Sequence, residues 1–466
     1  MTGQSAVDQT LPADETQVAT PDNRLAVIGL GYVGLPLATA MARVGIQVVG
    51  IDLDERKVDA INRGHSYIPD VSDEELAQAR AAGGLRATTD YGVLVDVDAI
   101  FICVPTPFDE MRAPDLKYIV SASEGIVPHL RRGHLVVLQS TTYPGTTEEV
   151  VQPILESSGL KAGGDFSLAF SPERIDPGNQ QWTVVNTPKV IGGLTPRCTQ
   201  RAAALLKAAG APVHMVTSPR AAEMTKLLEN IFRSVNIALV NELALLAERM
   251  GIDFWEVIEA AKTKPFGFMS FYPGPGVGGH CIPVDPYYLS WKARAYDFYT
   301  KFIELAAEVN QAMPYHIVDL VCQGVSQRGQ PLLGARVLVL GVAFKPDIDD
   351  ARNSPAERVI ELLMARGAVV TYHDPYVPTF NVGGDVFQPQ RLTLASVPLT
   401  EAAVTESDCV VIVTGHRELD YNWVAHYAPL VVDSCNATAD VREHFSQEAG
   451  RRQALIVRLG APAPVS

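Results

Sequence analysis

Apolar and polar positions follow a pattern along the chain that predicts three segments. The first opens with an apolar strand at Leu25–Ile28, a glycine-rich turn, an amphipathic helix at Leu35–Val44 and a strand at Gln47–Ile51. Strands that alternate with helical or loop stretches in this way indicate a parallel sheet. The further apolar strands expected in this segment are Ala99–Val104, His134–Gln139, Ser167–Phe170 and Val213–Val216.

From about Ser218 the apolar spacing changes to three and four residues and stays so for about thirty residues, which predicts one long helix. A helix of this length exceeds what most globular domains use. We therefore expect its apolar stripe to pack against other domains and against a second subunit. The stripe consists of Met224, Leu227, Leu228, Ile231, Val235, Leu239, Leu243 and Leu246.

The third segment begins after Gly329 and returns to strands and helices. A strand at Arg336–Leu340 and a helix at Pro355–Arg366 are followed by strands at Val369–Tyr372, Val410–Val413 and Leu430–Val432. Only Gly341 remains of a glycine-rich turn, so this segment is expected to bind something other than a second dinucleotide. The expected domains are 24–217, 218–328 and 329–466, after a disordered tail at 1–23.

Composition narrows the class of protein. The 466 residues exceed what one hydrophobic core supports, and 47% hydrophobic with 20% charged residues is typical of a soluble globular enzyme. A net charge of -15 argues against nucleic-acid and anionic-membrane partners. The six cysteines are scattered without metal spacing, so we expect no metal site and no disulfide framework. With no apolar run approaching the ~18 residues of a membrane span, the chain is expected in the cytoplasm.

The turn after the first strand has the sequence of a dinucleotide-binding loop. In Gly29-Leu30-Gly31-Tyr32-Val33-Gly34 the glycines permit a tight turn and let backbone N–H groups approach a pyrophosphate. Asp52 ends the second strand about 20 residues on, where a carboxylate binds the adenosine ribose and repels a 2′-phosphate. The pattern favours NAD, although the nearby Arg56 would suit NADP.

Two strand-end loops and two helical residues are further candidates. Val104-Pro105-Thr106-Pro107 and the loop of Thr141 end predicted strands and so face the cofactor crevice, although each, taken alone, is more typical of a turn than of a site. Lys226 and Asn230 share one helix face, where they would steady an alkoxide or hold the substrate. Spacing alone favours the alternative, an exposed face with a Glu223–Lys226 pair.

The segment from Tyr272 to Asp285 reads YPGPGVGGHCIPVD. Its glycines, Gly276 and Gly279 among them, let backbone amides come close to a ligand, and Cys281 follows them. A thiol suits a two-stage oxidation because it captures an aldehyde as a thiohemiacetal that can lose another hydride. The alternative is a buried structural cysteine. In the third segment, Lys345 and Arg352 are candidate pyrophosphate anchors or parts of a solvated turn.

In this order the motifs resemble the UDP-glucose/UDP-N-acetylhexosamine 6-dehydrogenase family from Arg24 to about Asn436. The resemblance implies an α/β fold of two Rossmann-like parallel-sheet domains joined by a central helical domain that dimerises. It implies NAD as cofactor and a UDP-sugar as substrate. It also assigns roles: Cys281 as nucleophile, with Lys226, Asn230, Asp285, Glu173 and Thr141 in catalysis, Arg352 at the cofactor, and Lys345 with Tyr272, Gly276 and Gly279 at the substrate.

The chain departs from the family's pattern at two positions, and alternatives for the sugar and the function remain. Pro265 stands where UDP-glucose enzymes carry an arginine that reaches into the partner's site, so recognition of the sugar between subunits must differ. Cys435 stands where the family often has an arginine, so the contact of that arginine is not carried over to this chain. UDP-N-acetylglucosamine is the expected sugar because the stretch from Lys264 to Gly276 resembles its dehydrogenases, with UDP-glucose and UDP-N-acetylmannosamine as alternatives. Phe266, Phe268, Met269 and Phe271 would seat the acetamido methyl or belong to a core. Two alternative hypotheses for the function are a single-step hydroxyacid dehydrogenase and an inactive nucleotide-sugar sensor.

Overall fold

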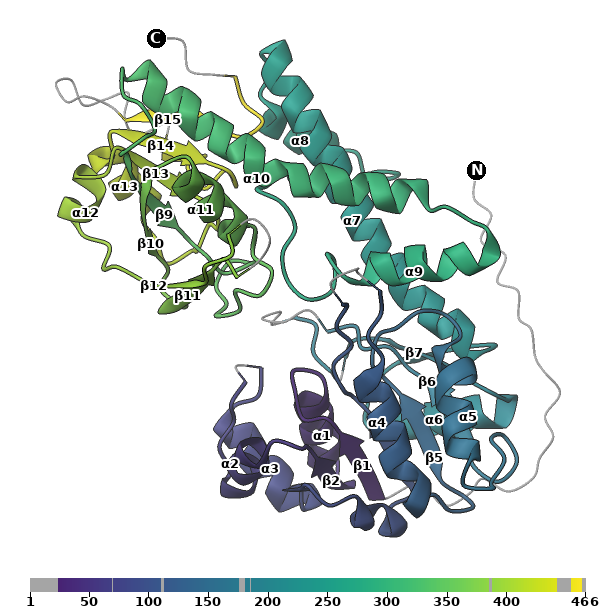
Figure 1. Ribbon diagram of the computed structural model, residues 1–466. Coiled ribbons are helices and arrows are strands. Elements are labelled where there is room, and N and C mark those ends of the chain that lie inside the picture. Colours follow the sequence, from purple (N-terminus) through teal and green to yellow (C-terminus); the bar gives the residue numbers. More distant parts are fainter. Residues whose placement is uncertain are drawn as a thin grey trace.

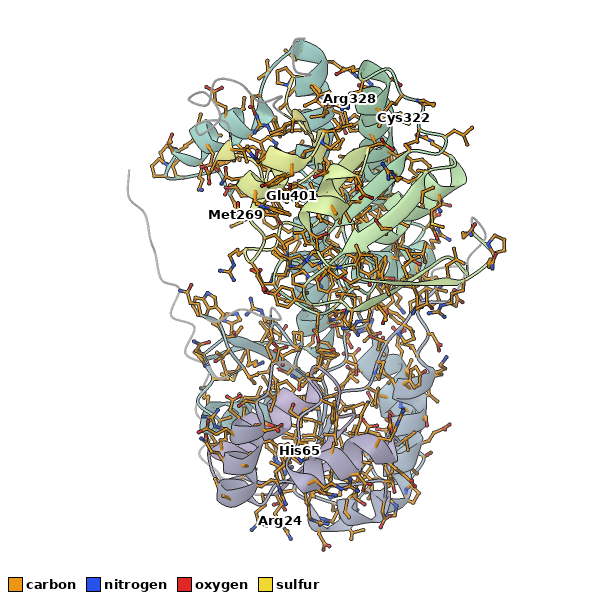
Figure 2. The ribbon with its side chains drawn as sticks, turned by 90° about the vertical axis from the view of Figure 1, so that its left-hand side faces the viewer. Arg24, His65, Met269, Cys322, Arg328 and Glu401 are labelled. Atoms are coloured by element: carbon orange, nitrogen blue, oxygen red, sulfur yellow. The ribbon has the colours of Figure 1, made fainter. Side chains whose placement is uncertain are left out.

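The computed structural model describes residues 24–68, 70–109, 113–175, 181–184, 186–384, 388–441 and 454–462. It contains two sheet domains and a set of long helices between them (Figure 1). The expected tail at 1–23 lies outside the described residues. Figure 2 shows the same division after a quarter turn, with Arg24 and His65 in the lower half and Arg328 and Cys322 in the upper half.

The N-terminal domain is built on an eight-stranded sheet of order β3-β2-β1-β4-β5-β6-β7-β8. The order reverses between β1 and β4, and ligands of such sheets bind outside the carboxyl ends of the strands at this point. The strands are β1 (Arg24–Ile28), β2 (Gln47–Ile51), β3 (Arg86–Thr88), β4 (Ala99–Ile102), β5 (Leu135–Leu138), β6 (Ser167–Phe170), β7 (Lys189–Gly193) and β8 (Val213–Val216). The helices are α1 (Gly34–Arg43), α2 (Glu55–Arg63), α3 (Asp73–Gly83), α4 (Lys117–Ile126), α5 (Gln152–Glu156) and α6 (Pro196–Ala208).

The predicted parallel sheet is confirmed except at one pairing. The strands at Ser167–Phe170 and Val213–Val216 end where the sequence predicted, and the others agree within two residues. The sequence analysis missed β3 and β7, and β7 pairs antiparallel with β6. Apolar strand residues fill both faces of the sheet, as expected for a sheet covered by helices on both sides.

The predicted long helix is α7 (Pro219–Met250), which spans 32 residues. Ser218 caps its first turn by accepting a hydrogen bond from the Ala221 amide, and Gly251 ends it in the left-handed conformation at φ 72°. It packs along α10 (Lys301–Gln327), and both cross the middle of the molecule with α8 (Phe254–Lys262) and α9 (Asp285–Ala293) (Figure 1). Much of the stripe stays exposed in the single chain, including Leu228, Leu239 and Leu246.

The C-terminal domain has a five-stranded parallel sheet of order β10-β9-β13-β14-β15 and a separate antiparallel pair, β11 and β12. The predicted strands and helix of this segment are confirmed to within a residue. The strands are β9 (Arg336–Leu340), β10 (Val369–His373), β11 (Thr379–Val382), β12 (Leu392–Ala395), β13 (Cys409–Ile412), β14 (Leu430–Asp433) and β15 (Leu455–Arg458). The helices are α11 (Pro355–Ala365), α12 (Glu401–Thr405) and α13 (Tyr421–Tyr427).

The end of β15 fastens this domain to the central helices. The Trp255 indole donates a hydrogen bond to the Leu459 carbonyl at 2.7 Å, and the Phe254 amide donates to the Gly460 carbonyl at 2.7 Å. Both donors belong to the start of α8. The C-terminal domain is therefore anchored directly beside α7. Among the helices in the described ranges, none is long and apolar enough to cross a membrane.

Candidate active site at the cysteine loop

The glycine turn after β1 forms an open cradle. A Cβ at Gly29 would lie 2.6 Å from the Cys103 carbonyl oxygen, and one at Gly34 would lie 1.8 Å from the Gly29 oxygen. At Gly31 a Cβ would meet nothing within 4 Å. Gly29 and Gly34 are therefore needed for packing of the turn, while the backbone at Gly31 is open to a ligand. This arrangement fits a dinucleotide pyrophosphate at the start of α1.

Asp52 lies beside the turn, at the end of β2. Its carboxylate accepts hydrogen bonds from the Leu30 amide at 2.9 Å and the Lys57 ammonium at 3.2 Å. Arg56 does not contact it, because its guanidinium pairs with Asp54 at 2.9 Å and is 91% exposed. A neighbour missed in the sequence, Lys57, thus provides the cation next to Asp52.

The loops that end β4 and β5 lie at the same edge of the sheet. The Ser140 hydroxyl donates to the Val104 carbonyl at 2.7 Å, which joins the two loops, and Thr141 follows, partly buried. The Tyr288 hydroxyl of α9 donates to the Thr106 carbonyl. The candidate cofactor loops are thereby tied to the helix that begins at the cysteine loop.

Four predicted site residues meet where the cysteine loop enters α9. The Asp285 amide donates to the Cys281 carbonyl at 2.8 Å, and the Asn230 side chain donates to the Asp285 carboxylate at 2.5 Å. Lys226 lies one turn before Asn230 on α7, and both are buried, at 7% and 5% exposure. The exposed-face alternative is therefore wrong. Glu223 does not pair with Lys226, because its carboxylate accepts from the Gly145 amide at 2.6 Å.

Burial sets the electrostatics of this cluster. It raises the pKa of the Cys281 thiol to about 11, with the Asp285 carboxylate adding to the rise and Lys226 opposing it. Burial likewise raises the pKa of Asp285 to about 6, against the lowering effects of Lys226 and of the hydrogen bond from Asn230. A carboxyl that ionises near pH 6 can exchange protons with groups in the cleft at neutral pH.

The C-terminal domain holds the glycine part of the loop. The Gly279 amide donates to the Arg352 carbonyl at 3.0 Å, and the Asn353 side chain donates to the Gly279 carbonyl at 3.0 Å. A Cβ at Gly278 would lie 2.7 Å from the Cβ of Phe344. At Gly276, where φ is 129°, it would lie 3.1 Å from the Asn310 carbonyl oxygen of α10. The glycines therefore allow close contact between domains.

Arg352 connects all three parts of the molecule. Its guanidinium pairs with Asp350 at 2.5 Å and stacks over the ring of Tyr32, 4.8 Å from the ring centre, in the glycine turn. It also lies 3.5 Å from Nδ1 of His280, the residue before Cys281. Burial and Arg352 lower the pKa of His280, which keeps the ring neutral. The sequence offered His280 as part of the loop but gave no reason to single it out.

A pocket of about 320 Å³ opens at the carboxyl edge of the C-terminal sheet, close to Lys345 in sequence. Ligands of parallel sheets bind at this edge. Cys435 forms part of the wall, and burial raises the pKa of its thiol well above the usual range. The lining residues are Pro346, Gly415, His416, Arg417, Leu419, Tyr421, Cys435 and Ala437.

Two predicted site residues make their recorded contacts elsewhere. Glu173 follows β6 and is paired with Lys189, with its carboxylate 2.7 Å from the ammonium. Tyr272 stacks on Trp255 with 5.9 Å between ring centres, and its hydroxyl donates to Glu259 on α8.

The aromatic segment before the glycine loop is not core. Phe266, Phe268 and Met269 are 72%, 43% and 65% exposed in the single chain. The alternative that they fill the middle domain is therefore wrong, while Phe271 contacts Phe232 of α7 edge to face. Within the described part of the chain, no group of three or more His, Cys, Asp or Glu side chains is placed to hold a metal ion.

Comparison with known families matches each of the three segments in order. The NAD binding domain of the UDP-glucose/GDP-mannose dehydrogenase family matches residues 23–209. The central domain of the same family matches residues 220–312, and its UDP binding domain matches residues 338–442.

Individual relatives extend over most of the chain. It is 37% identical over 411 residues to UDP-N-acetyl-D-mannosamine dehydrogenase of Escherichia coli K12, covering 84% of this chain and 94% of that protein. It is 38% identical over 358 residues to UDP-N-acetyl-D-glucosamine 6-dehydrogenase of Pseudomonas aeruginosa, covering 76% and 83%. A solved UDP-D-ManNAc dehydrogenase from Pyrococcus horikoshii superposes with a TM-score of 0.82 at 32% identity, covering 94% and 99%.

Proposed function

The chain belongs to the UDP-glucose/GDP-mannose dehydrogenase family and is an NAD-dependent UDP-sugar dehydrogenase, and from this premise we propose that it oxidises a UDP-hexose at C6 in two stages. The alcohol becomes an aldehyde and then a carboxylate. The observation that carries the proposal is the cluster of the partly buried Cys281 with the buried Lys226, Asn230 and Asp285 at the junction of the domains.

Cys281 is the proposed covalent nucleophile. Its sulfur adds to the aldehyde carbon while the carbonyl oxygen takes up a proton, which gives a thiohemiacetal. Loss of the hydride from that carbon and of the proton from its hydroxyl then leaves a thioester. Water then adds to the acyl carbon, the C–S bond breaks, and the acid leaves while the sulfur regains a proton. Because burial holds the pKa of the thiol at about 11, it must be deprotonated within the cluster.

Lys226 is the residue that favours charge on the sulfur. Its ammonium lowers the pKa of the Cys281 thiol, and the same positive charge would stabilise an alkoxide at the sugar. Asn230 fixes the orientation of Asp285 through the 2.5 Å hydrogen bond. Asp285, whose pKa is about 6, is the group in this cluster able to exchange a proton near neutral pH.

The glycine turn and its neighbours would hold NAD. The Gly29–Gly34 turn would bind the pyrophosphate, Asp52 the adenosine ribose, and the loops of Val104, Thr106 and Thr141 would line the crevice. Arg352, stacked on Tyr32, would reach the cofactor from the C-terminal domain. When bound, NAD supplies the oxidising power by taking one hydride at each stage.

The UDP-sugar would lie between the cysteine loop and the C-terminal domain. Lys345 is proposed at its phosphates, with the backbone at Gly276 and Gly279 close to the ligand. The resemblance also assigns Tyr272 to the substrate and Glu173 to activation of the water that hydrolyses the thioester.

A homodimer formed through α7 is part of the proposal. Leu228, Leu239, Leu246 and Met250 are exposed by 59%, 53%, 50% and 63% in the single chain. Contiguous apolar surface of this kind marks an interaction site, and a second copy of the same helix offers a self-complementary partner.

Counting NADH tests the reaction. With limiting UDP-sugar and excess NAD, the proposal predicts about two NADH per sugar, because the alcohol is oxidised through to the acid. A single-step dehydrogenase would give one and a nucleotide-sugar sensor none. Cys281→Ser should make no acid while still binding NAD and UDP-sugar, since a serine hydroxyl is a far weaker nucleophile. Full turnover by that variant would contradict the mechanism.

UDP-N-acetylglucosamine is the proposed sugar. The supporting observations are the resemblance of residues 264–276 and the similarity to a dehydrogenase named for this substrate. Exposed Phe266, Phe268 and Met269 would seat the acetamido methyl, which is worth about 1 kcal/mol when buried. The test compares kcat/KM for UDP-glucose and the N-acetyl derivatives of UDP-glucosamine, UDP-galactosamine and UDP-mannosamine. A preference of about tenfold for UDP-glucose would refute this sugar but not the reaction.

A further inference from the structure

A line of buried polar side chains runs along one edge of the sheet, at the carboxyl ends of β4, β5 and β6 and the amino end of β7. Cys103 and Gln139 directly follow β4 and β5, and Glu173 comes three residues after β6. Lys189 opens β7, which is antiparallel to β6 with Phe170 opposite Gly192. Continuing this register by three residues sets Glu173 opposite Lys189. The antiparallel strand thus brings a lysine to an edge of the sheet that parallel strands alone would not supply.

Lys189 and Glu173 form a buried ion pair. The ammonium lies 2.7 and 2.9 Å from the two carboxylate oxygens, and the residues are 1% and 7% exposed. Gln139 donates to the second oxygen at 2.7 Å, and the Arg174 amide donates to the first at 2.8 Å. The side-chain oxygen of Gln139 in turn accepts a hydrogen bond from the Cys103 thiol, with 3.6 Å between oxygen and sulfur. The Ile175 amide also donates to the first oxygen, at 3.1 Å, so each oxygen accepts from at least two donors.

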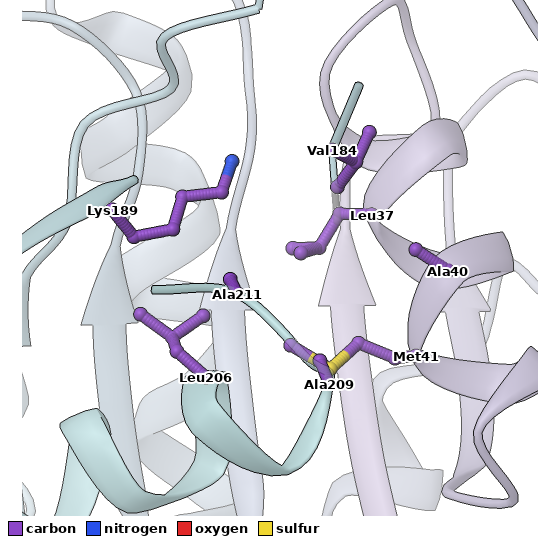
Figure 3. A pocket seen from close by; sticks show the side chains of 8 residues that line it. All are labelled: Leu37, Ala40, Met41, Val184, Lys189, Leu206, Ala209 and Ala211. Atoms are coloured by element: carbon purple, nitrogen blue, oxygen red, sulfur yellow. The ribbon is translucent and has the colours of Figure 1, made fainter. Parts of the chain in front are cut away.

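The surroundings make this ammonium the counter-ion of Glu173. The stem of Lys189 lies against a small apolar pocket, with its nitrogen directed away from Leu206 (Figure 3). The other lining residues are Leu37, Ala40, Met41, Val184, Ala209 and Ala211. Gln139 and Cys103 face Glu173 as neutral groups, and the Arg174 guanidinium is directed to Glu229 of α7, 2.7 Å away. Within the described residues, Lys189 supplies the recorded ammonium contact to both oxygens of Glu173.

We propose that Lys189 is a positioning residue for thioester hydrolysis: it keeps the Glu173 carboxylate ionised and oriented so that it accepts the proton of the attacking water. The inference rests on the proposed function. In this step the water oxygen bonds to the acyl carbon, one water proton passes to Glu173, the C–S bond breaks, and that proton goes to the Cys281 sulfur. An isolated buried carboxylate takes up a proton instead of remaining charged. Without Lys189, the buried charge of the Glu173 carboxylate would lose the ammonium that contacts both of its oxygens.

The test measures hydrolysis separately from oxidation. Full-length enzyme is mixed with UDP-N-acetylglucosamine and excess NAD, and NADH and acid are followed between pH 5.5 and 9.5 for the wild type, Lys189→Met and Lys189→Arg. Lys189→Met should still release about two NADH per site in a burst but should form acid about tenfold more slowly than the wild type at pH 7. The fall of its hydrolysis rate at acidic pH should begin about one pH unit higher than in the wild type. Lys189→Arg should stay within about threefold of wild type because it restores the positive charge.

Two controls keep the result specific. Lys161→Met removes a surface ion pair in which the Lys161 ammonium lies 3.1 Å from the Glu156 carboxylate. This variant should hydrolyse the thioester at the wild-type rate. If Lys189→Met does not fold, Glu173→Gln/Lys189→Met leaves no unpaired buried charge and should show the burst with slow hydrolysis and no acidic limb in this range.

The outcomes separate the two proposals. Fewer than two NADH per sugar from the wild type, with the UDP-sugar that has the highest kcat/KM, overturns the proposed function, whatever the variants do. Two NADH from the wild type, together with wild-type hydrolysis and an unmoved acidic limb in Lys189→Met, overturns the role of Lys189 alone. Hydrolysis at the wild-type rate by Glu173→Gln/Lys189→Met would also overturn the role of Lys189.

Discussion

At the scale of single residues, the reactivity of Cys281 depends on two charged neighbours of opposite effect. Burial and Asp285 raise the pKa of the thiol, and Lys226 lowers it. Asp285→Asn should therefore speed alkylation of Cys281 by iodoacetamide at pH 8 by about threefold or more, because the thiolate fraction rises as the pKa falls towards pH 8. Lys226→Met should slow it. Mass spectrometry of the Cys281 peptide gives both rates.

Exposed Asp59→Asn provides the control for the alkylation experiment. Asp59 pairs with Arg63 on α2 and has a side-chain exposure of 63%. The alkylation rate of Cys281 should be unchanged in this variant, since exposed charges are screened by solvent. Slower alkylation in Asp285→Asn than in wild type would contradict the assigned electrostatics.

We propose that the choice between NAD and NADP depends on the carboxylate of Asp52. Asp52 stays beside the glycine turn, bonded to Leu30 and Lys57, whereas Arg56 is turned to solvent. Asp52→Asn should reduce the preference for NAD over NADP by about tenfold or more, since the like-charge repulsion of a 2′-phosphate is lost. Arg56→Ala should leave the ratio of kcat/KM with NAD to kcat/KM with NADP nearly unchanged. Equal efficiency of the wild type with both cofactors would contradict the role of Asp52.

The candidate site was predictable from sequence only where its contacts are local. Lys226 and Asn230 share a helix face, and Asp285 follows Cys281 by one turn, so spacing places these residues near one another. Lys189 gave no such signal, because its contact with Glu173 depends on a strand reversal between residues 16 apart. Arg352 was predicted as an anchor, but its stacking on Tyr32 required knowledge of how the domains meet.

At the scale of elements, the glycine loop transmits the position of the C-terminal domain to Cys281. A Cβ at Gly278 would clash with Phe344, whereas one at Gly274 would meet nothing within 4 Å. Gly278→Ala should lower kcat/KM by about tenfold or more because the loop must shift from its contact. Gly274→Ala is the matched control and should stay within about twofold. Equal activity of both variants would show that the loop adapts without cost.

The elements themselves were predicted where periodicity was strong. Long apolar runs gave β1, β2, β6 and β9, and the three- and four-residue spacing gave α7. The strand β7 was missed because its sequence, KVIGG, offers two apolar residues before a glycine pair. The glycines are there for packing: a Cβ at Gly192 would lie 2.0 Å from the Ser218 carbonyl oxygen at the start of α7.

At the scale of the whole molecule, the exposed stripe of α7 predicts a dimer. Leu239→Glu should halve the mass measured by light scattering in solution, because a buried charge at a self-complementary interface is introduced twice. Leu333→Glu, at a site with 74% exposure in the C-terminal domain, is the control and should leave the mass unchanged. An unchanged mass in Leu239→Glu would place the interface elsewhere.

The central claim is that the oxidised sugar is carried on Cys281. The direct measurement is acid quenching of the enzyme during turnover with UDP-N-acetylglucosamine and NAD, followed by peptide mass spectrometry. The account predicts an acyl adduct on the Cys281 peptide, more abundant in Glu173→Gln, where hydrolysis is slowed, and absent in Cys281→Ser. Acid formation by Cys281→Ser at the wild-type rate, or a covalent adduct on another residue, would contradict it.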